Sequence, residues 1–111
     1  MYDNWHNMTL AEQLGNIGSD YERALHWKRK DNQKMLEGAL ARALEQIDLS
    51  LSDPRWAGPR RREIARMRDE VCKEILADEI NMYSAQQLQR YFMAFAVASR
   101  REKGCNPADL L

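Results

Sequence analysis

The chain has 111 residues, of which 17 are basic and 17 are acidic, so its formal net charge is zero. This length fits one domain with its own core, over residues 1–111, and is too short for two. A hydrophobic share of 44% beside 31% charged residues is typical of a globular chain rather than a disordered one. A zero net charge argues against a globally basic protein, the simplest kind of binder of nucleic acid or anionic membranes.

No segment predicts export or membrane insertion. Residues 1–10 lack the basic and apolar regions of a signal peptide, and the longest apolar run, residues 91–98, is far shorter than a membrane span. The two cysteines, Cys72 and Cys105, lack the C-x-x-C spacing of zinc and redox motifs. We therefore expect a core thiol at Cys72, an exposed thiol at Cys105, no membrane partner and a cytoplasmic location.

The first predicted helix covers residues 10–30. Thr9 and Glu12 form a T-x-x-E capping box, in which two side chains satisfy amide groups at a helix start. Apolar side chains then recur on one face of the predicted helix: Leu10, Leu14, Ile17, Tyr21, Ala24 and Leu25.

Small residues lie beside this apolar face. Ala11, Gly15 and Ser19 are spaced four apart, and Gly18 adds a second glycine. Each glycine costs about 1 kcal/mol against alanine inside a helix, so some packing or functional reason is expected. We expect the close approach of a neighbouring helix, and the alternative is a gap that admits a ligand.

The second predicted helix covers residues 33–51, with Asp31 or Asn32 as its N-cap. The residue before Pro54 is pushed away from helical geometry, which ends this helix. Its apolar side chains recur at intervals of three and four: Leu36, Leu40, Leu44, Ile47 and Leu51.

The third predicted helix covers residues 59–79. Pro59 follows Gly58 and suits the first helical position, and Asn81 is expected to end the helix in a left-handed conformation. Its stripe comprises Ile64, Met67, Val71 and Ile75, with Cys72 and Leu76 alongside.

The fourth predicted helix covers residues 85–103 and begins at a second capping box, Ser84 with Gln87. Because the connections between the four helices are short, consecutive helices are expected to run antiparallel. The predicted fold is therefore all-α, an antiparallel up-down four-helix bundle.

The fourth predicted helix is apolar around nearly its whole circumference. Met93 and Val97 lie about 120 to 180° from the core stripe on a helical wheel. Because such a helix is usually buried on more than one side, we expect a homo-oligomer, with a dimer as the first guess, whose interface includes these two residues. The alternative is coverage by Trp5 or by the tail at residues 110–111. The core stripe itself comprises Leu88, Tyr91, Phe92, Phe95 and Ser99.

The zero net charge conceals segments of opposite sign. Residues 55–68 carry six basic residues and one acidic residue, whereas residues 69–80 carry one basic and five acidic residues. All six basic side chains are arginines, and Trp56 lies among them. We call this group the arginine block: Arg55, Arg60, Arg61, Arg62, Arg66 and Arg68.

The arginine block has three interpretations. Arginine can hold phosphates in a bidentate way and Trp56 could stack on a base, which indicates an RNA site. Alternatively, Arg62 and Arg66 pair with nearby acidic residues on a solvated helix surface, or the arginines meet a protein partner. Several arginines lie near a helix start, where the helix dipole disfavours cations, so an anion or carboxylate is expected nearby.

Catalytic and metal-binding patterns are weak. The only histidines are His6 and His26, and no E-x-x-H motif of di-iron bundles occurs. Gly15 and Gly18 follow no predicted strand and are wrongly spaced for a phosphate-binding loop. We therefore expect no enzyme, no cofactor and no metal site.

Four segments resemble a family of short bacterial hypothetical proteins without an assigned activity. They are "NWHNMTLAEQLGNIGSDYERALHWK" (4–28), "RALEQIDLSLSDPRW" (42–56), "REIARMRDEVC" (62–72) and "YFMAFAVASR" (91–100). The resemblance spans most of the chain and implies no catalytic residues.

At the level of fold, the chain is similar to HEPN domains and the related intervening-sequence four-helix bundles. Active HEPN ribonucleases carry an R-x(4–6)-H motif, but here only two residues separate Arg23 from His26, and no histidine follows. The resemblance implies a non-catalytic bundle that dimerises or supports another protein. The sequence thus favours self-association or protein binding, and the alternative is a small RNA-binding accessory protein that uses residues 55–68.

Overall fold

The computed structural model describes residues 4–102, which form four α-helices and two short 3₁₀ helices. The predicted all-α class with four helices is confirmed, and no strand occurs within this range. The elements are η1 (Trp5–Asn7), α1 (Leu10–Arg29), α2 (Gln33–Leu51), η2 (Pro54–Trp56), α3 (Pro59–Leu76) and α4 (Met82–Glu102).

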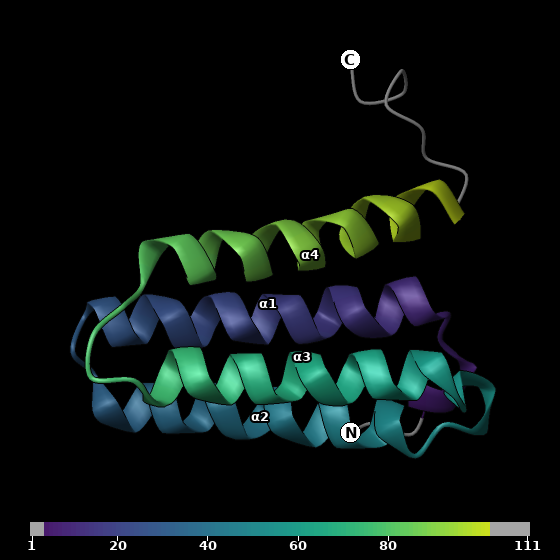
Figure 1. Cartoon of the computed structure of the whole chain (residues 1–111), viewed down its shortest axis with the longest axis horizontal. Helices are drawn as coiled ribbons and strands as arrows, with labels where there is room; N and C mark the ends of the chain where they lie inside the picture. Colours follow the sequence, from purple (N-terminus) through teal and green to yellow (C-terminus); the bar gives the residue numbers. More distant parts are fainter. Residues whose placement is uncertain (1–3, 103–111) are drawn as a thin grey trace.

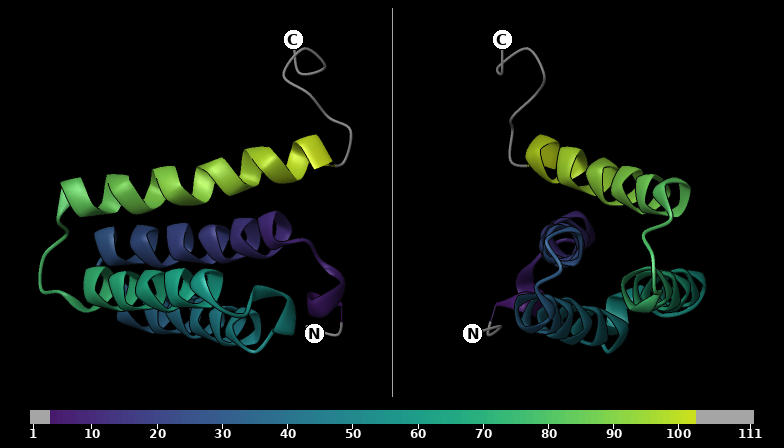
Figure 2. Two further views of the ribbon diagram at one scale, coloured as in Figure 1. Left: turned by 45° about the vertical axis from the view of Figure 1, so that its right-hand side comes forward. Right: turned by 90° about the vertical axis from the view of Figure 1, so that its left-hand side faces the viewer.

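The helix α1 lies between α4 and α2, and it packs closely against both (Figures 1 and 2). The helix α3 packs beside α2 and has a much smaller contact with α4. Both 3₁₀ helices lie at the end of the molecule where α1 begins, α2 ends and α3 begins (Figure 1).

The predicted apolar stripes form the core. On α1, every predicted core residue except the half-buried Leu10 is completely buried. The capping box at the start of α1 is also confirmed: the Glu12 amide donates to the Thr9 hydroxyl, and the Thr9 amide donates to the Glu12 carboxylate, each at 3.1 Å. The predicted start of α3 at Pro59 is confirmed, after Gly58 with φ of +86°.

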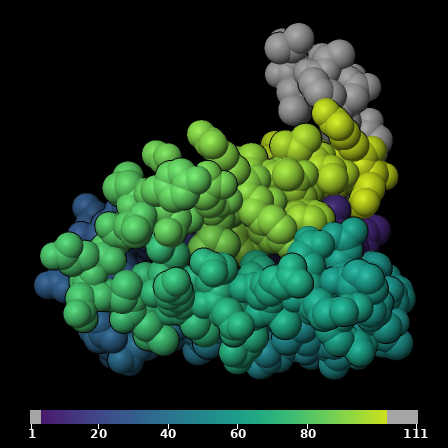
Figure 3. Space-filling model, viewed as in Figure 1, coloured from purple at the N-terminus to yellow at the C-terminus, as the bar shows by residue number. Residues whose placement is uncertain are grey.

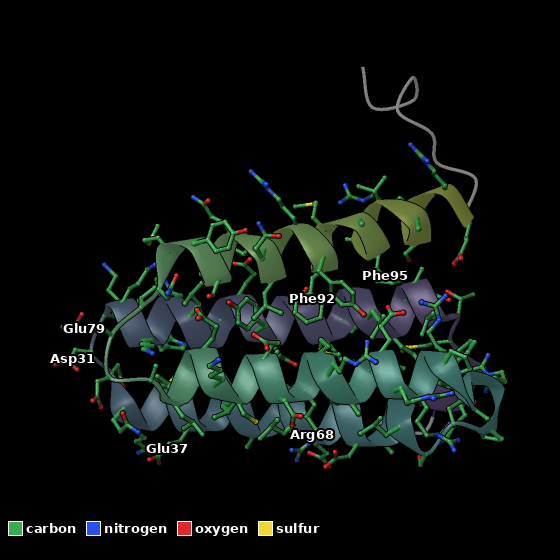
Figure 4. The ribbon with its side chains drawn as sticks, in the orientation of Figure 1. Asp31, Glu37, Arg68, Glu79, Phe92 and Phe95 are labelled. Carbon is green, nitrogen blue, oxygen red and sulfur yellow. The ribbon has the colours of Figure 1, made fainter. Side chains whose placement is uncertain are left out.

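The helix α4 packs tightly against α1 at Gly18 and Gly15. A Cβ atom placed there would lie 2.5 Å from the Cβ of Phe92, and one placed at Gly15 would lie 3.6 Å from the Cα of Ala96. Phe92 extends from the side of α4 that faces α1 (Figure 4). The expected close approach of a neighbouring helix is confirmed, and of the two glycines Gly18 is needed, because Phe92 of α4 lies against it.

The predicted end of α3 was three residues too late. The helix ends at Leu76 because Ala77 adopts an extended backbone, with φ of −66° and ψ of 153°. Lys28 of α1 covers this end, since its Nζ donates to the carbonyls of Glu74 and Ala77 at 2.6 and 2.7 Å. Leu76 is 67% exposed, so it does not join the predicted stripe.

The prediction that Asn81 ends α3 is wrong, because this residue caps the start of α4. Its side chain accepts a hydrogen bond from the Ser84 amide at 3.0 Å, so α4 begins at Met82 without the predicted box of Ser84 and Gln87. Among the described residues other than glycine, the positive φ belongs to Asp31, at 56°.

Two smaller expectations are resolved by the same structure. Of the two candidate caps for α2, Asn32 is the one used, because its side chain accepts from the Met35 amide at 3.1 Å. Cys72 is half-buried and not a fully buried core thiol, and Cys105 lies outside the described residues.

The close approach of α1 and α4 predicts opposite effects at the two glycines. Gly18→Ala should destabilise the chain by about 1 to 3 kcal/mol, because the new methyl group collides with Phe92 and displaces α4. Gly15→Ala should be neutral or stabilise by up to about 1 kcal/mol, because the methyl group fits and the helix gains propensity. Urea unfolding of both variants measures the difference; equal stabilities would contradict the predicted role of Gly18.

Candidate functional site

A cluster of buried polar side chains joins η1, α1, α2 and η2. The Trp5 indole donates to the Ser50 hydroxyl at 3.2 Å, and that hydroxyl donates to Oε1 of Gln13 at 2.9 Å. The Trp56 indole also donates to this Oε1 atom, at 2.9 Å. Gln13 and Ser50 are fully buried, so these hydrogen bonds satisfy groups that water cannot reach. The cluster comprises Trp5, Gln13, Ser50, Asp53, Arg55 and Trp56 and is called the polar cluster below.

Asp53 links the polar cluster to the start of the arginine block. Its carboxylate is buried and accepts from Nη2 of Arg55 at 2.7 Å, from Nε of Arg55 at 3.1 Å and from Nε2 of Gln13 at 3.3 Å. His6 Nδ1 lies 3.4 Å from the same carboxylate. The hydrogen bonds from Arg55, which outweigh the opposing effect of burial, hold the pKa of Asp53 far below its usual range.

Arg55 and Trp56 are both engaged in contacts within the chain. Besides binding Asp53, Arg55 donates to the carbonyl of Met8 at 2.7 Å, and its guanidinium lies 4.5 Å from the centre of the Trp56 ring. Because Arg55 covers this ring and Gln13 binds the indole nitrogen, Trp56 is poorly placed to stack on a nucleic-acid base.

The rest of the arginine block is divided among several contacts. Arg60 pairs with Glu63 at 3.1 Å, and Arg68 extends toward α2 and pairs with Asp48 at 2.9 Å (Figure 4). Arg61 donates to the carbonyl of Asp53 at 3.4 Å. The block is therefore not one continuous cationic surface.

Arg62 and Arg66 differ from the other arginines of the block. Both are exposed, and neither forms an ion pair or side-chain hydrogen bond within residues 4–102. The expected pairing of these two arginines with neighbouring acidic residues of α3 is not formed. They are the members of the block whose charges are left for another molecule.

An apolar groove separates α3 from α4. Figure 3 faces this side of the molecule, where the green part of α4 lies beside teal α3. The groove has a volume of about 430 Å³, and its inner residues Met67 and Leu88 belong to the core. It is lined by Glu63, Arg66, Met67, Glu70, Tyr83, Ser84, Gln87, Leu88 and Tyr91.

Tyr91 closes one part of the groove. Its hydroxyl donates to Glu63 of α3 at 3.0 Å, and its ring packs edge-on against the rings of Phe92 and Phe95. Burial, together with the carboxylate of Glu63, raises the pKa of Tyr91 well above its usual value. The hydroxyl therefore stays protonated and holds α4 to α3 at this point.

The predicted interface residues lie on another side of α4. Met93 is 58% exposed and lines a shallow hollow beside Gly15 and Gly18, whereas Val97 is half-buried. Trp5 does not cover this side, because it is buried in the polar cluster. The other segment considered as a cover, residues 110–111, lies outside the described residues.

Sequence reasoning did not find the groove. It assigned Met67 to the core stripe of the third helix, and Leu88 and Tyr91 to that of the fourth. The burial of Met67 and Leu88 supports this assignment. A single-helix pattern shows which face is apolar but not how far two helices stand apart. The predicted apolar excess at Met93 and Val97 lies outside the groove, and Tyr83, which lines it and is 72% exposed, precedes the predicted fourth helix.

No group of three or more histidine, cysteine or acidic residues within the described part of the chain could hold a metal ion. None of the helices in that part is both long enough and apolar enough to cross a membrane. No protein-family model, curated protein or solved structure matches this chain.

The lowered pKa of Asp53 predicts a pH-dependent contribution to stability. Asp53→Asn should lower the free energy of unfolding at neutral pH by about 1 to 2 kcal/mol, because the charged hydrogen bonds to the partly exposed Arg55 are lost. In the native chain this contribution is complete above pH of about 4, the ordinary aspartate pKa, and declines as the pH falls further.

Urea unfolding of the native chain and of Asp53→Asn at a series of pH values measures this effect. The difference between the two proteins should shrink below pH of about 4, since Asp53 then binds a proton in the unfolded chain while the folded chain, with its lowered pKa, does not. A difference that stayed constant down to the lowest pH would show that the carboxylate charge contributes nothing.

Proposed function

We propose that this chain is a non-enzymatic helical-bundle protein that acts by self-association, with α4 at the interface. The observation that carries the proposal is exposed apolar surface on α4: Tyr83, at the edge of the groove, is 72% exposed, and Met82 and Met93, which lie outside the groove, are 56 and 58% exposed. Contiguous exposed apolar surface marks interaction sites more often than scattered apolar residues do. The groove adds further apolar surface on the α3 side of α4.

The proposal includes an antiparallel up-down arrangement of the four helices and a cytoplasmic location. Contacts between helix ends support the arrangement. The start of α1 meets the end of α4, where Thr9 donates to Glu102 at 2.6 Å, and the end of α1 meets the end of α3 through Lys28. A different protein as the partner is the alternative occupant of the same surface.

A nucleic-acid function has less support. It needs an arginine surface with an accessible aromatic ring, whereas Arg55, Arg60 and Arg68 are bound to acidic side chains of the same chain. Among the described residues, Arg62 and Arg66 of the block have no ion pair or side-chain hydrogen bond, and Arg61 binds only the carbonyl of Asp53. So few free charges give a weak, strongly salt-dependent contact with a polyanion.

The proposal predicts a mass above that of a monomer. Sedimentation velocity over a range of micromolar concentrations should show a species near twice the monomer mass of 13.0 kDa, with a fraction that rises with concentration. A sedimentation coefficient that stays at the monomer value up to the highest concentration would overturn self-association.

Binding to heparin and RNA distinguishes self-association from a nucleic-acid function. The chain should elute from heparin at low salt and bind structured or single-stranded RNA weakly at physiological salt. Retention of the chain on heparin at physiological salt, abolished by Arg62→Glu alone and by Arg66→Glu alone, would overturn the protein-interaction proposal in favour of nucleic-acid binding.

A further inference from the structure

One stripe of α3, which includes the groove-lining Glu63, Arg66 and Glu70, carries charges of alternating sign. Glu63, Arg66, Glu70 and Lys73 are spaced three, four and three residues apart, which places them in one stripe along the helix. Positions at equal distance from the two ends of the stripe carry opposite charges: Glu63 corresponds to Lys73, and Arg66 corresponds to Glu70. A second α3 that runs in the opposite direction therefore sets Arg66 against the partner's Glu70 and Glu63 against the partner's Lys73.

The central pair of this stripe is free to bind another molecule. Arg66 and Glu70 are exposed, and neither forms an ion pair within residues 4–102. By contrast, Glu63 already binds Arg60 and the Tyr91 hydroxyl, so its charge is largely used inside the chain. Recognition would therefore rest mainly on Arg66 and Glu70.

The charges border apolar surface that the chain itself leaves open. Arg66 and Glu70 line the groove beside Met67, and Tyr83 and Leu88 line it from α4. An interface with an apolar centre and charged rim matches the usual composition of protein contacts. The two kinds of surface lie together here, because α4 stands close to α1 and apart from α3.

We propose that the α3–α4 groove binds the same groove of a second copy, with the two α3 helices antiparallel about a two-fold axis. In this dimer Arg66 pairs with the partner's Glu70, and Glu70 pairs with the partner's Arg66. The proposal rests on the self-association proposed above and names its surface.

The charge pattern is the reason for choosing a second copy as the occupant. A two-fold contact requires a surface that is complementary to itself. The stripe meets this requirement in one orientation only, because a parallel α3 in the same register would set like charges opposite each other. An unrelated partner would need no such symmetry in the charges of this chain.

Charge reversal at the two central positions tests the pairing. Arg66→Glu leaves two carboxylates at positions 66 and 70, and Glu70→Arg leaves two guanidinium groups there. Each variant alone should dissociate at least about tenfold more readily than the native chain, because like charges then face each other across the axis. An equimolar mixture of the two variants should form a heterodimer with an affinity near the native value.

The mixture also separates binding from folding, because a misfolded variant could not be rescued by its counterpart. Circular dichroism should show native helicity for both variants. Lys34→Glu and Glu37→Arg make the same changes of charge on exposed positions of α2 and should leave the dimer intact. The double variant Met93→Glu, Val97→Glu should also leave it intact, since those residues lie outside the groove.

The outcomes distinguish this inference from the proposed function. A native chain that is monomeric at all concentrations overturns both. A native dimer that neither charge reversal weakens, or a mixture that forms no heterodimer, overturns the groove contact and leaves self-association standing. A native dimer that is lost only in the Met93→Glu, Val97→Glu variant places the interface on the other side of α4 and overturns the groove contact in the same way.

Discussion

The packing of Phe92 against Gly18 determines where α4 lies. The Phe92 side chain occupies the space that a side chain at position 18 would need, and its ring packs 5.6 Å from that of Tyr21. The helix α4 therefore packs closely on α1, whereas its contact with α3 is much smaller. The groove lies between α3 and α4, on the side where α4 has the smaller contact.

At the end of the molecule near η1 and η2, polar side chains are buried. There a carboxylate, an amide and a hydroxyl are buried, and such groups are tolerated only where hydrogen bonds replace water. Asp53 and Gln13 meet this condition through Arg55, Trp5 and Trp56. The polar cluster thus ties the N-terminal segment to the α2–α3 connection and pairs Arg55 of the arginine block with a buried carboxylate of the same chain.

Helix positions and core residues could be predicted because both depend on local pattern. Apolar spacing located all four helices, and the box at Thr9 located the start of α1. The end of α3 was wrong because it depends on the backbone of Ala77 and on Lys28, a residue far away in sequence. Asn81 was misassigned because asparagine suits a helix start and a left-handed end equally well, and only the chain path decides between them.

The candidate site was less predictable than the fold, since it depends on pairs of elements. Arg55, Arg60 and Arg68 looked equivalent to Arg66 in the sequence, yet acidic partners from the same chain neutralise the first three. What remains is a small exposed charge pattern beside apolar surface. Charges on a surface that binds its own copy must find opposite charges on that same surface, which the α3 stripe provides. The balance of charge within the stripe therefore supports the proposed partner of like sequence over a polyanion.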